Sequence, residues 1–163
     1  MLLPVALLML FALPQATDAT APPANVQAKL TAVGIGVQIY TCTQQNGTFA
    51  WQFTEPQATL FDPATHQPVG THTAGPTWTW SDGSLVTGKV LQKQASPVAA
   101  SIPWLLLEAT PSGERGALSS ITLVRRSDTQ AGAAPVDGCD AQNDGVLIKV
   151  PYQATYTFYE PAR

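Results

Sequence analysis

The feature that most constrains the fold is an alternation of apolar and polar side chains along most of the chain. In the segment 146–158, every second residue is apolar or aromatic: Val146, Ile148, Val150, Tyr152, Ala154, Tyr156 and Phe158. Side chains of a β-strand point to opposite faces in turn, so a period of two is typical of a strand with one buried face. The chain beyond its N-terminal segment repeats this period and carries no convincing helical spacing. The sequence therefore predicts an all-β fold.

Turn-forming residues divide the alternating segments into short strands. Asn46-Gly47 favours the left-handed backbone of a two-residue hairpin turn and separates GVQIYTC from TFAWQF. Asp62-Pro63 and Asp82-Gly83 interrupt the pattern again. Eight or nine strands joined by such turns are typical of a single-domain antiparallel β-sandwich or flattened β-barrel. The sequence does not separate these two architectures.

The N-terminal segment differs from the rest of the chain. Its apolar run, Leu2 to Leu13, is shorter than the roughly 20 residues that a membrane-spanning helix needs. Small residues follow it, so we expect a signal peptide over 1–19, cut near Ala19 with Ala16 as the alternative. A Pro/Ala-rich leader over 20–32 and a single all-β domain over 33–163 complete the expected organisation. The mature chain then has no transmembrane segment and is secreted or periplasmic.

The composition of the chain argues against a nucleic-acid partner and gives no sign of a metal or a cofactor. Charged residues make up 12%, compared with about 25% in ordinary soluble proteins. The net charge is −3, and the eight Lys and Arg residues are scattered singly, so we expect no nucleic-acid partner. No histidine or cysteine spacing of a metal site is present, so we expect no metal and no cofactor.

The chain contains two cysteines, Cys42 and Cys139. In an exported protein, a single pair is read first as a disulfide. A catalytic thiol is the alternative, and it would require an activating histidine, which the sequence does not indicate. We therefore predict a disulfide between Cys42 and Cys139.

The segment GTHTAGPTWTWSDGS, at 70–84, gathers the strongest candidates for a binding site: His72, Trp78, Asp82 and Ser84. Trp78 and Trp80 lie two residues apart, so a strand would place both rings on one face. That face is either part of the core or an exposed platform that stacks a glycan or another small molecule, and core is the more common use. His72 is likewise either a structural hydrogen-bonding residue or a reactive one.

Three functions are compatible with these residues. The first is a binding or surface-interaction module whose contact surface lies around 72–84. The second is an extracytoplasmic hydrolase or lyase in which His72 acts with Asp82 or with Glu108. Glu108 ends the apolar run IPWLLLEA, a strand expected to be buried on both faces, so its carboxyl group is either partly buried or, as the more common arrangement, at the strand end beside Arg125 or Arg126. The third is a structural envelope protein without a small ligand. No G-x-S-x-G motif supports the second function, so an enzyme is the less favoured interpretation.

Five segments carry a resemblance to a known family: GVQIYTC at 36–42, the sequence around Leu60-Phe61-Asp62, GTHTAGPTW with DGS at 82–84, IPWLLL at 102–107, and VPYQATYTFY at 150–159. Together they resemble the secreted domain-of-unknown-function family 3455 of bacteria and fungi, over nearly the whole mature chain. The resemblance implies a single exported β domain, and the family brings no established activity. It covers His72, Trp78 and Asp82, whereas Trp80 departs from the family pattern. It therefore favours the first three residues as a functional cluster.

Overall fold

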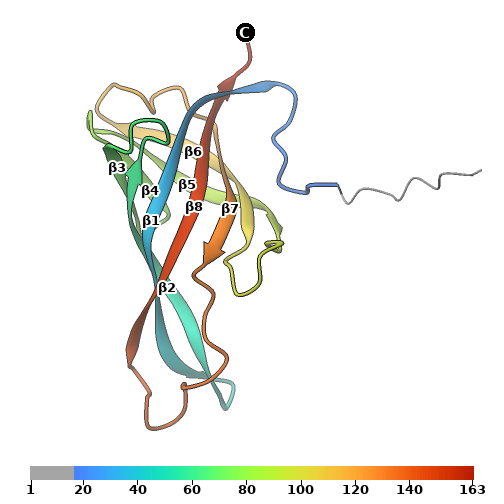
Figure 1. Cartoon of the computed structure of the whole chain (residues 1–163), viewed down its shortest axis with the longest axis vertical. Helices are drawn as coiled ribbons and strands as arrows, with labels where there is room; N and C mark the ends of the chain where they lie inside the picture. Colours follow the sequence, from blue (N-terminus) through green and yellow to red (C-terminus); the bar gives the residue numbers. More distant parts are fainter. Residues whose placement is uncertain (1–16) are drawn as a thin grey trace, which may run out of the picture.

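The protein is described by a computed structural model over residues 17–163, and these residues form one closed β-barrel (Figure 1). Its eight strands are β1 (Val26–Gln45), β2 (Thr48–Phe61), β3 (Pro68–Thr73), β4 (Thr77–Trp80), β5 (Ser84–Gln94), β6 (Trp104–Gly113), β7 (Leu123–Ala131) and β8 (Leu147–Pro161). Each strand pairs antiparallel with the next in sequence, and β1 pairs with β8 to close the ring. The all-β prediction is confirmed, and the architecture is the barrel rather than the open sandwich.

The barrel begins earlier than the expected domain boundary at residue 33. Residues 1–16, most of the expected signal peptide, lie outside the described residues. Strand β1 starts at Val26 and pairs with the end of β8, so residues 26–32 belong to the sheet and not to a leader. Val26, Ala28, Leu30 and Ala32 alternate with polar residues here, so the strand pattern was present in the expected leader; pairing with β8 is irregular between Ala28 and Leu30. No helix among residues 17–163 is long and apolar enough to cross a membrane.

Because consecutive strands are antiparallel, their connections alternate between the two ends of the barrel. We call the end that carries the β4–β5 turn (81–83) and the β6–β7 connection (114–122) the closed end. The opposite end carries the β3–β4 turn (74–76) and the β5–β6 (95–103) and β7–β8 (132–146) connections, and we call it the open end. The two ends differ in how they are filled, and this difference positions the candidate site.

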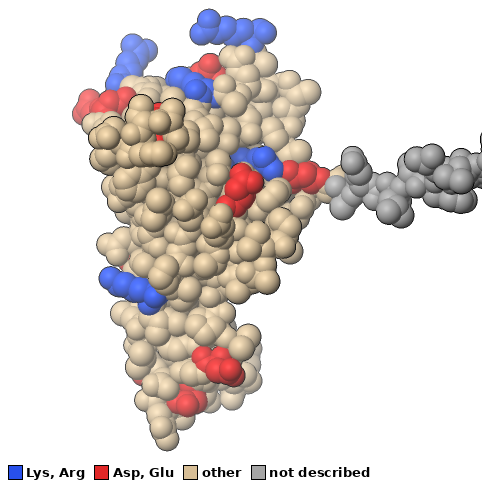
Figure 2. Space-filling view, in the orientation of Figure 1, with Lys and Arg blue, Asp and Glu red and all other residues tan. Residues whose placement is uncertain are grey.

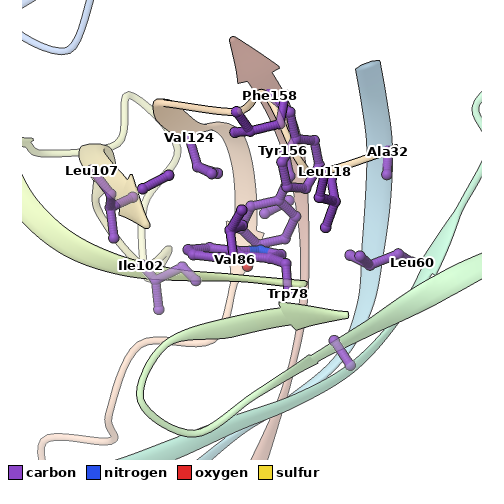
Figure 3. Close-up of a cluster of buried hydrophobic side chains, with 14 of the residues drawn as sticks. Ala32, Leu60, Trp78, Val86, Ile102, Leu107, Leu118, Val124, Tyr156 and Phe158 are labelled. Carbon is purple, nitrogen blue, oxygen red and sulfur yellow. The ribbon is translucent and has the colours of Figure 1, made fainter. Parts of the chain in front are cut away.

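The core occupies the closed end and the middle of the barrel (Figure 3). The alternating residues of β8 point inward, and Tyr152, Ala154, Tyr156 and Phe158 are all buried, as the pattern predicts. Leu118 and Ile121 also have no exposed surface. They come from the 114–122 connection and fold into the barrel, so the closed end is plugged by its own chain.

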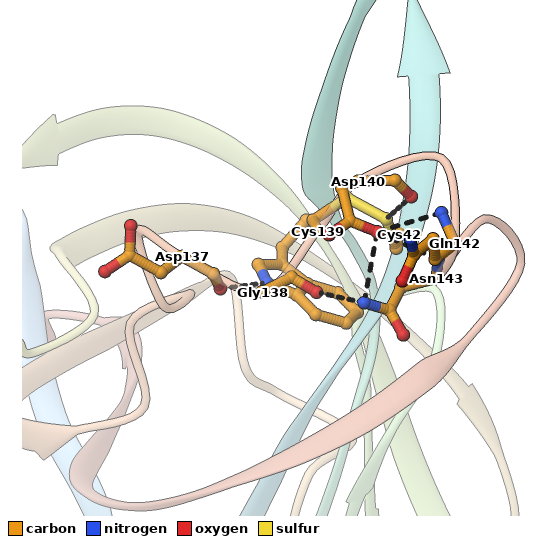
Figure 4. Close-up of a disulfide and its surroundings, with 8 residues drawn as sticks. Cys42, Asp137, Gly138, Cys139, Asp140, Gln142 and Asn143 are labelled. Atoms are coloured by element: carbon orange, nitrogen blue, oxygen red, sulfur yellow. Dashed lines mark hydrogen bonds between the residues drawn. A yellow bond between two sulfur atoms is a disulfide. The ribbon is translucent and has the colours of Figure 1, made fainter.

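A long hairpin extends the barrel at the open end. Asn46 and Gly47 both have positive φ, 51° and 82°, which confirms the predicted two-residue turn between β1 and β2. In Figure 1 this hairpin projects beyond the barrel, and the 132–146 connection lies beside it. Cys42 and Cys139 form the predicted disulfide, with 5.3 Å between their Cα atoms, and so attach this connection to β1 (Figure 4). The Trp51 indole N–H also donates to the Asp137 carbonyl at 2.9 Å.

The run IPWLLLEA supplies the end of the β5–β6 connection and the start of β6, and it is buried on both faces at Leu106 and Leu107. Partial burial of Glu108 was the wrong alternative: its side chain is exposed, and neither described ion pair includes it. Its neighbours Leu107 and Ala109 fill the inward positions, so Glu108 points outward, where it lies opposite Lys89 of β5.

The segment before β1 packs on the outer surface of the barrel. The Asp18 carboxylate forms an ion pair with Arg125 of β7 and accepts hydrogen bonds from the backbone and hydroxyl of Thr20, which is completely buried. The backbone N–H of Ala19 donates to the side chain of Gln94. Cleavage after Ala16 would preserve these contacts, whereas cleavage after Ala19 would remove Asp18 from the chain.

Candidate functional site

A cavity of about 480 Å³ opens at the open end of the barrel. Much of its wall is apolar and comes from four different elements: Phe53 and Pro56 of β2, Val90 of β5, Ile102 of the β5–β6 connection, and Leu105 and Leu107 of β6. Phe53 and Val90 are about half exposed, at 54% and 49%, so they lie at the mouth. An eight-stranded barrel is wide enough to hold one small ligand when side chains do not fill it, and the cavity has the size of a ligand pocket.

His72 lines this cavity from the end of β3, just before the β3–β4 turn. Its ring is stacked on the Trp78 ring with 4.4 Å between centroids, and only 2% of the residue is exposed. Nδ1 lies 3.0 Å from the Thr77 carbonyl oxygen, which can only accept, so Nδ1 carries the proton. Burial lowers the pKa of His72 to about 4, against the opposing effect of the Thr77 hydrogen bond. The imidazole is therefore neutral near pH 7.

Trp78 forms part of the cavity wall as well as the core. It is 1% exposed and lies edge-on to Tyr156 and Phe158. Gly88 of β5 makes room for it, because a Cβ at Gly88 would lie 2.8 Å from the Trp78 ring. Trp80 is partly buried and packs on Phe158 at 5.8 Å. Neither ring is an exposed platform, so the core interpretation of the tryptophan pair describes both.

Polar side chains that the sequence analysis did not select also line the cavity. Arg126 of β7 is partly buried, and its Nε donates to the Pro103 carbonyl at 3.0 Å. Gln38 of β1 is 2% exposed, and its Nε2 has no hydrogen-bond partner in the described part of the chain. The same is true of Nε1 of Trp78. A buried donor without an acceptor is costly, and native structures contain few of them.

Two tyrosines, Tyr40 and Tyr156, line the cavity, and a third, Tyr152, contacts Tyr156. The hydroxyls of Tyr152 and Tyr156 are 3.0 Å apart, and the hydroxyl of Tyr40 donates to the Gly132 carbonyl at 2.6 Å. Burial raises the pKa of all three phenols, and the nearby positive charge of Arg126 only partly opposes it. These tyrosines therefore stay protonated and can donate hydrogen bonds at any ordinary pH.

Asp82 and Ser84 lie at the closed end, away from the cavity. Asp82 accepts hydrogen bonds from the N–H and hydroxyl of Ser84 and from the N–H of Ala117. The Ser84 hydroxyl oxygen in turn accepts from the buried N–H of Leu118 at 3.1 Å. These bonds hold the 114–122 connection in the barrel and lower the pKa of Asp82. Of the four predicted site residues, the fold brings His72 and Trp78 together and separates Asp82 and Ser84 from them.

The role of Ser84 can be tested by Ser84→Ala. The change leaves the buried N–H of Leu118 without its acceptor, which we expect to cost about 1–3 kcal/mol of unfolding free energy. Chemical denaturation would measure this loss. Ser81→Ala, an exposed position in the same turn, is the matched control and should change stability little. Equal stabilities of the two variants would contradict the role of Ser84 in anchoring the closed end.

The cavity holds no catalytic pair of the kind that the hydrolase hypothesis requires. No Asp or Glu is among its lining residues in the part of the chain that the structure describes. Glu108 points outward, and Asp82 lies at the other end of the barrel. Over residues 17–163, no three His, Cys, Asp or Glu side chains gather as a metal site would require.

The outer surface is sparsely charged. Figure 2 shows Lys, Arg, Asp and Glu as separate spots on otherwise uncharged surface, with no basic stripe on that face. The described residues contain two ion pairs, Arg125–Asp18 and Lys29–Glu160, and both lie outside the cavity. The distinctive chemistry of the molecule is therefore inside its open end.

Comparison with known proteins yields one match. No curated protein and no solved structure matches the chain. Residues 22–160 match the family model described as protein of unknown function DUF3455. This range includes β1 to β7, all of β8 except its last residue, and the whole cavity, and it agrees with the resemblance in the sequence segments. The chain belongs to the DUF3455 family.

Proposed function

We propose that this protein is a binding protein that holds a small, partly apolar molecule in the open end of its barrel. The observation that carries the proposal is the 480 Å³ cavity, which combines an apolar wall with buried polar atoms that lack partners. Specific small-molecule sites typically consist of an apolar pocket with a few polar groups that orient the ligand. In this proposal His72 and Trp78 form part of the cavity wall, and Asp82 and Ser84 stabilise the closed end of the barrel.

The proposal includes export of the protein. A disulfide persists in oxidising compartments, and Cys42–Cys139 fits a protein that acts outside the cytoplasm. The expected signal peptide would deliver the chain there. A carrier or sensor in such a compartment needs no catalytic pair, in keeping with the lack of a carboxylate beside His72.

Binding can be tested with 1-N-phenylnaphthylamine, an uncharged dye that fluoresces in apolar surroundings. We expect a saturable increase in fluorescence with the wild-type protein. Val90→Trp adds an indole ring at the mouth of the cavity, and we expect it to weaken binding about tenfold or more, because a filled pocket loses apolar contact and water release.

Leu91→Trp is the matched control for this variant. Leu91 is as exposed as Val90, at 47% and 49%, but it does not line the cavity. We expect its affinity for the dye to equal that of the wild type. A dye that does not bind saturably, or one that both variants weaken equally, would contradict the proposal and favour a structural protein without a small ligand.

A further inference from the structure

We infer that the ligand of the cavity carries a carboxylate group, which Arg126 binds, at one end of an apolar body. This inference rests on the proposed function and names the chemical class of the molecule bound there. Four observations support it: the charge of the wall, the available donors, the mixture of polar and apolar groups in the lining, and the position of Arg126 in β7.

The wall of the cavity carries positive charge without a negative partner. Arg126 and Lys93 line it, and no Asp or Glu does so in the described residues. Neither described ion pair involves Arg126, and residues 1–16 contain no Asp or Glu. Charges that are removed from water are normally paired. Arg126 is a partly buried guanidinium, and the described residues offer it no carboxylate. We therefore expect an anionic ligand to balance its charge.

The donors around Arg126 exceed the acceptors. A guanidinium has five N–H donors; the bond from Nε to the Pro103 carbonyl uses one of them, and the Tyr156 hydroxyl lies beside another. Gln38 Nε2 and Trp78 Nε1 are buried donors on the same wall without partners. A carboxylate is acceptor-only and can take up to four hydrogen bonds, two of them from a single arginine. An amine or another donor group would leave these N–H groups unsatisfied.

The lining combines polar and apolar side chains, which argues for an amphiphilic ligand. Arg126 is paired with Tyr156 of β8 and bound through Nε to Pro103, whereas Phe53 and Val90 are apolar and half exposed. Leu105 and Leu107 extend the apolar part of the wall. We therefore place the carboxylate beside Arg126 and the apolar body along these apolar side chains.

Arg125 and Arg126 lie on opposite faces of the barrel wall and have different surroundings. They are consecutive on β7, so they point to opposite faces of the sheet. Arg125 lies outside, pairs with Asp18 and stacks over Trp104. Arg126 lies inside and has no such partner. This arrangement provides a matched pair of variants in which the same side chain is removed from one face or the other.

The test compares four ligands with the same eight-carbon chain on the wild-type protein: octanoate, 1-octanol, octylamine and octyl phosphate, by isothermal titration calorimetry at pH 7.5. We expect octanoate to bind about 10–100 times more tightly than 1-octanol, since hydrogen bonds to charged groups are stronger than neutral ones. Octylamine should bind most weakly. Octyl phosphate should bind no more tightly than octanoate, because the lining of the cavity includes a single arginine.

Arg126→Gln should abolish the preference, so that this variant binds octanoate no more tightly than it binds 1-octanol. Arg126→Lys keeps the charge without the planar fork and should retain part of the preference. Arg125→Gln should retain all of it.

The outcomes separate the two proposals. If the uncharged dye binds and Val90→Trp weakens it, but octanoate and 1-octanol bind equally, the cavity is a binding site and the carboxylate inference is wrong. A preference for octanoate that survives Arg126→Gln also overturns the inference, as does an octyl phosphate affinity more than tenfold above that of octanoate. If none of the ligands binds and the dye does not either, the proposed function itself fails.

Discussion

Removing the disulfide with the double change Cys42→Ala and Cys139→Ala is expected to lower the free energy of unfolding by about 4–5 kcal/mol. The bridge closes a loop of 97 residues, and it restricts the unfolded chain far more than a short bridge would. A loss of this size is comparable with the total stability of a small domain. Urea denaturation of the oxidised wild type and of the double variant measures the difference.

In the folded state, backbone hydrogen bonds also hold together the segments that the disulfide joins. The N–H of Cys42 donates to the Val146 carbonyl and the N–H of Gly145 to the Cys42 carbonyl, both at 2.9 Å, and these bonds hold the connection beside β1 without sulfur. We therefore expect the double variant to fold to the same barrel and still bind the uncharged dye.

Two controls separate the covalent link from its surroundings. Trp51→Phe removes only the hydrogen bond from the indole to Asp137 and should cost about 0.5–1.5 kcal/mol. Wild-type protein treated with dithiothreitol should match the double variant. If the double variant is as stable as the oxidised wild type, the loop is constrained by contacts in the unfolded chain and not by the bridge.

The strands could be predicted because side-chain alternation is a property of the backbone within each strand. The inward row of β8 and the Asn46-Gly47 turn follow from local patterns alone, and so does the all-β class. Closure of the barrel could not be predicted. It depends on the pairing of β1 with β8, for example Gly34 with Ala154, and alternation is the same in a strand whether its partner closes a ring or not.

The candidate site was predicted in part for a related reason. Proximity in sequence suggested that His72, Trp78, Asp82 and Ser84 act together. β4 ends at Trp80 and the chain turns at 81–83, so Asp82 and Ser84 lie at the closed end and bond to the 114–122 connection, whereas Trp78 and His72 face the cavity. Arg126 and Gln38 come from distant strands. They stand out only when the fold shows that their positions face inward, because a single arginine or glutamine in a strand is most often on its outer face.

Acidification is expected to destabilise the protein through His72. The ring is buried and its pKa falls to about 4 in the folded protein, compared with 6.5 in the unfolded chain. The unfolded state therefore binds a proton at a higher pH than the folded state does. Stability is complete above pH 6.5 and is lost as the pH falls toward 4, by about 3 kcal/mol over this range. Urea denaturation at a series of pH values between 7 and 4 measures the loss.

His72→Gln should remove most of this slope, whatever its effect on absolute stability, because an amide does not titrate. His66→Gln is the matched control, since His66 is exposed in the β2–β3 connection and its ring meets water in both states. The pKa values of Asp18, Asp62, Asp82 and Glu160 are all lowered, so these carboxyl groups titrate mainly below the window. If stability still falls with pH in His72→Gln, the prediction fails. His72 would then be hydrated or paired with an anion in the folded protein, and the cavity wall would be less dry than the stacking of His72 on Trp78 implies.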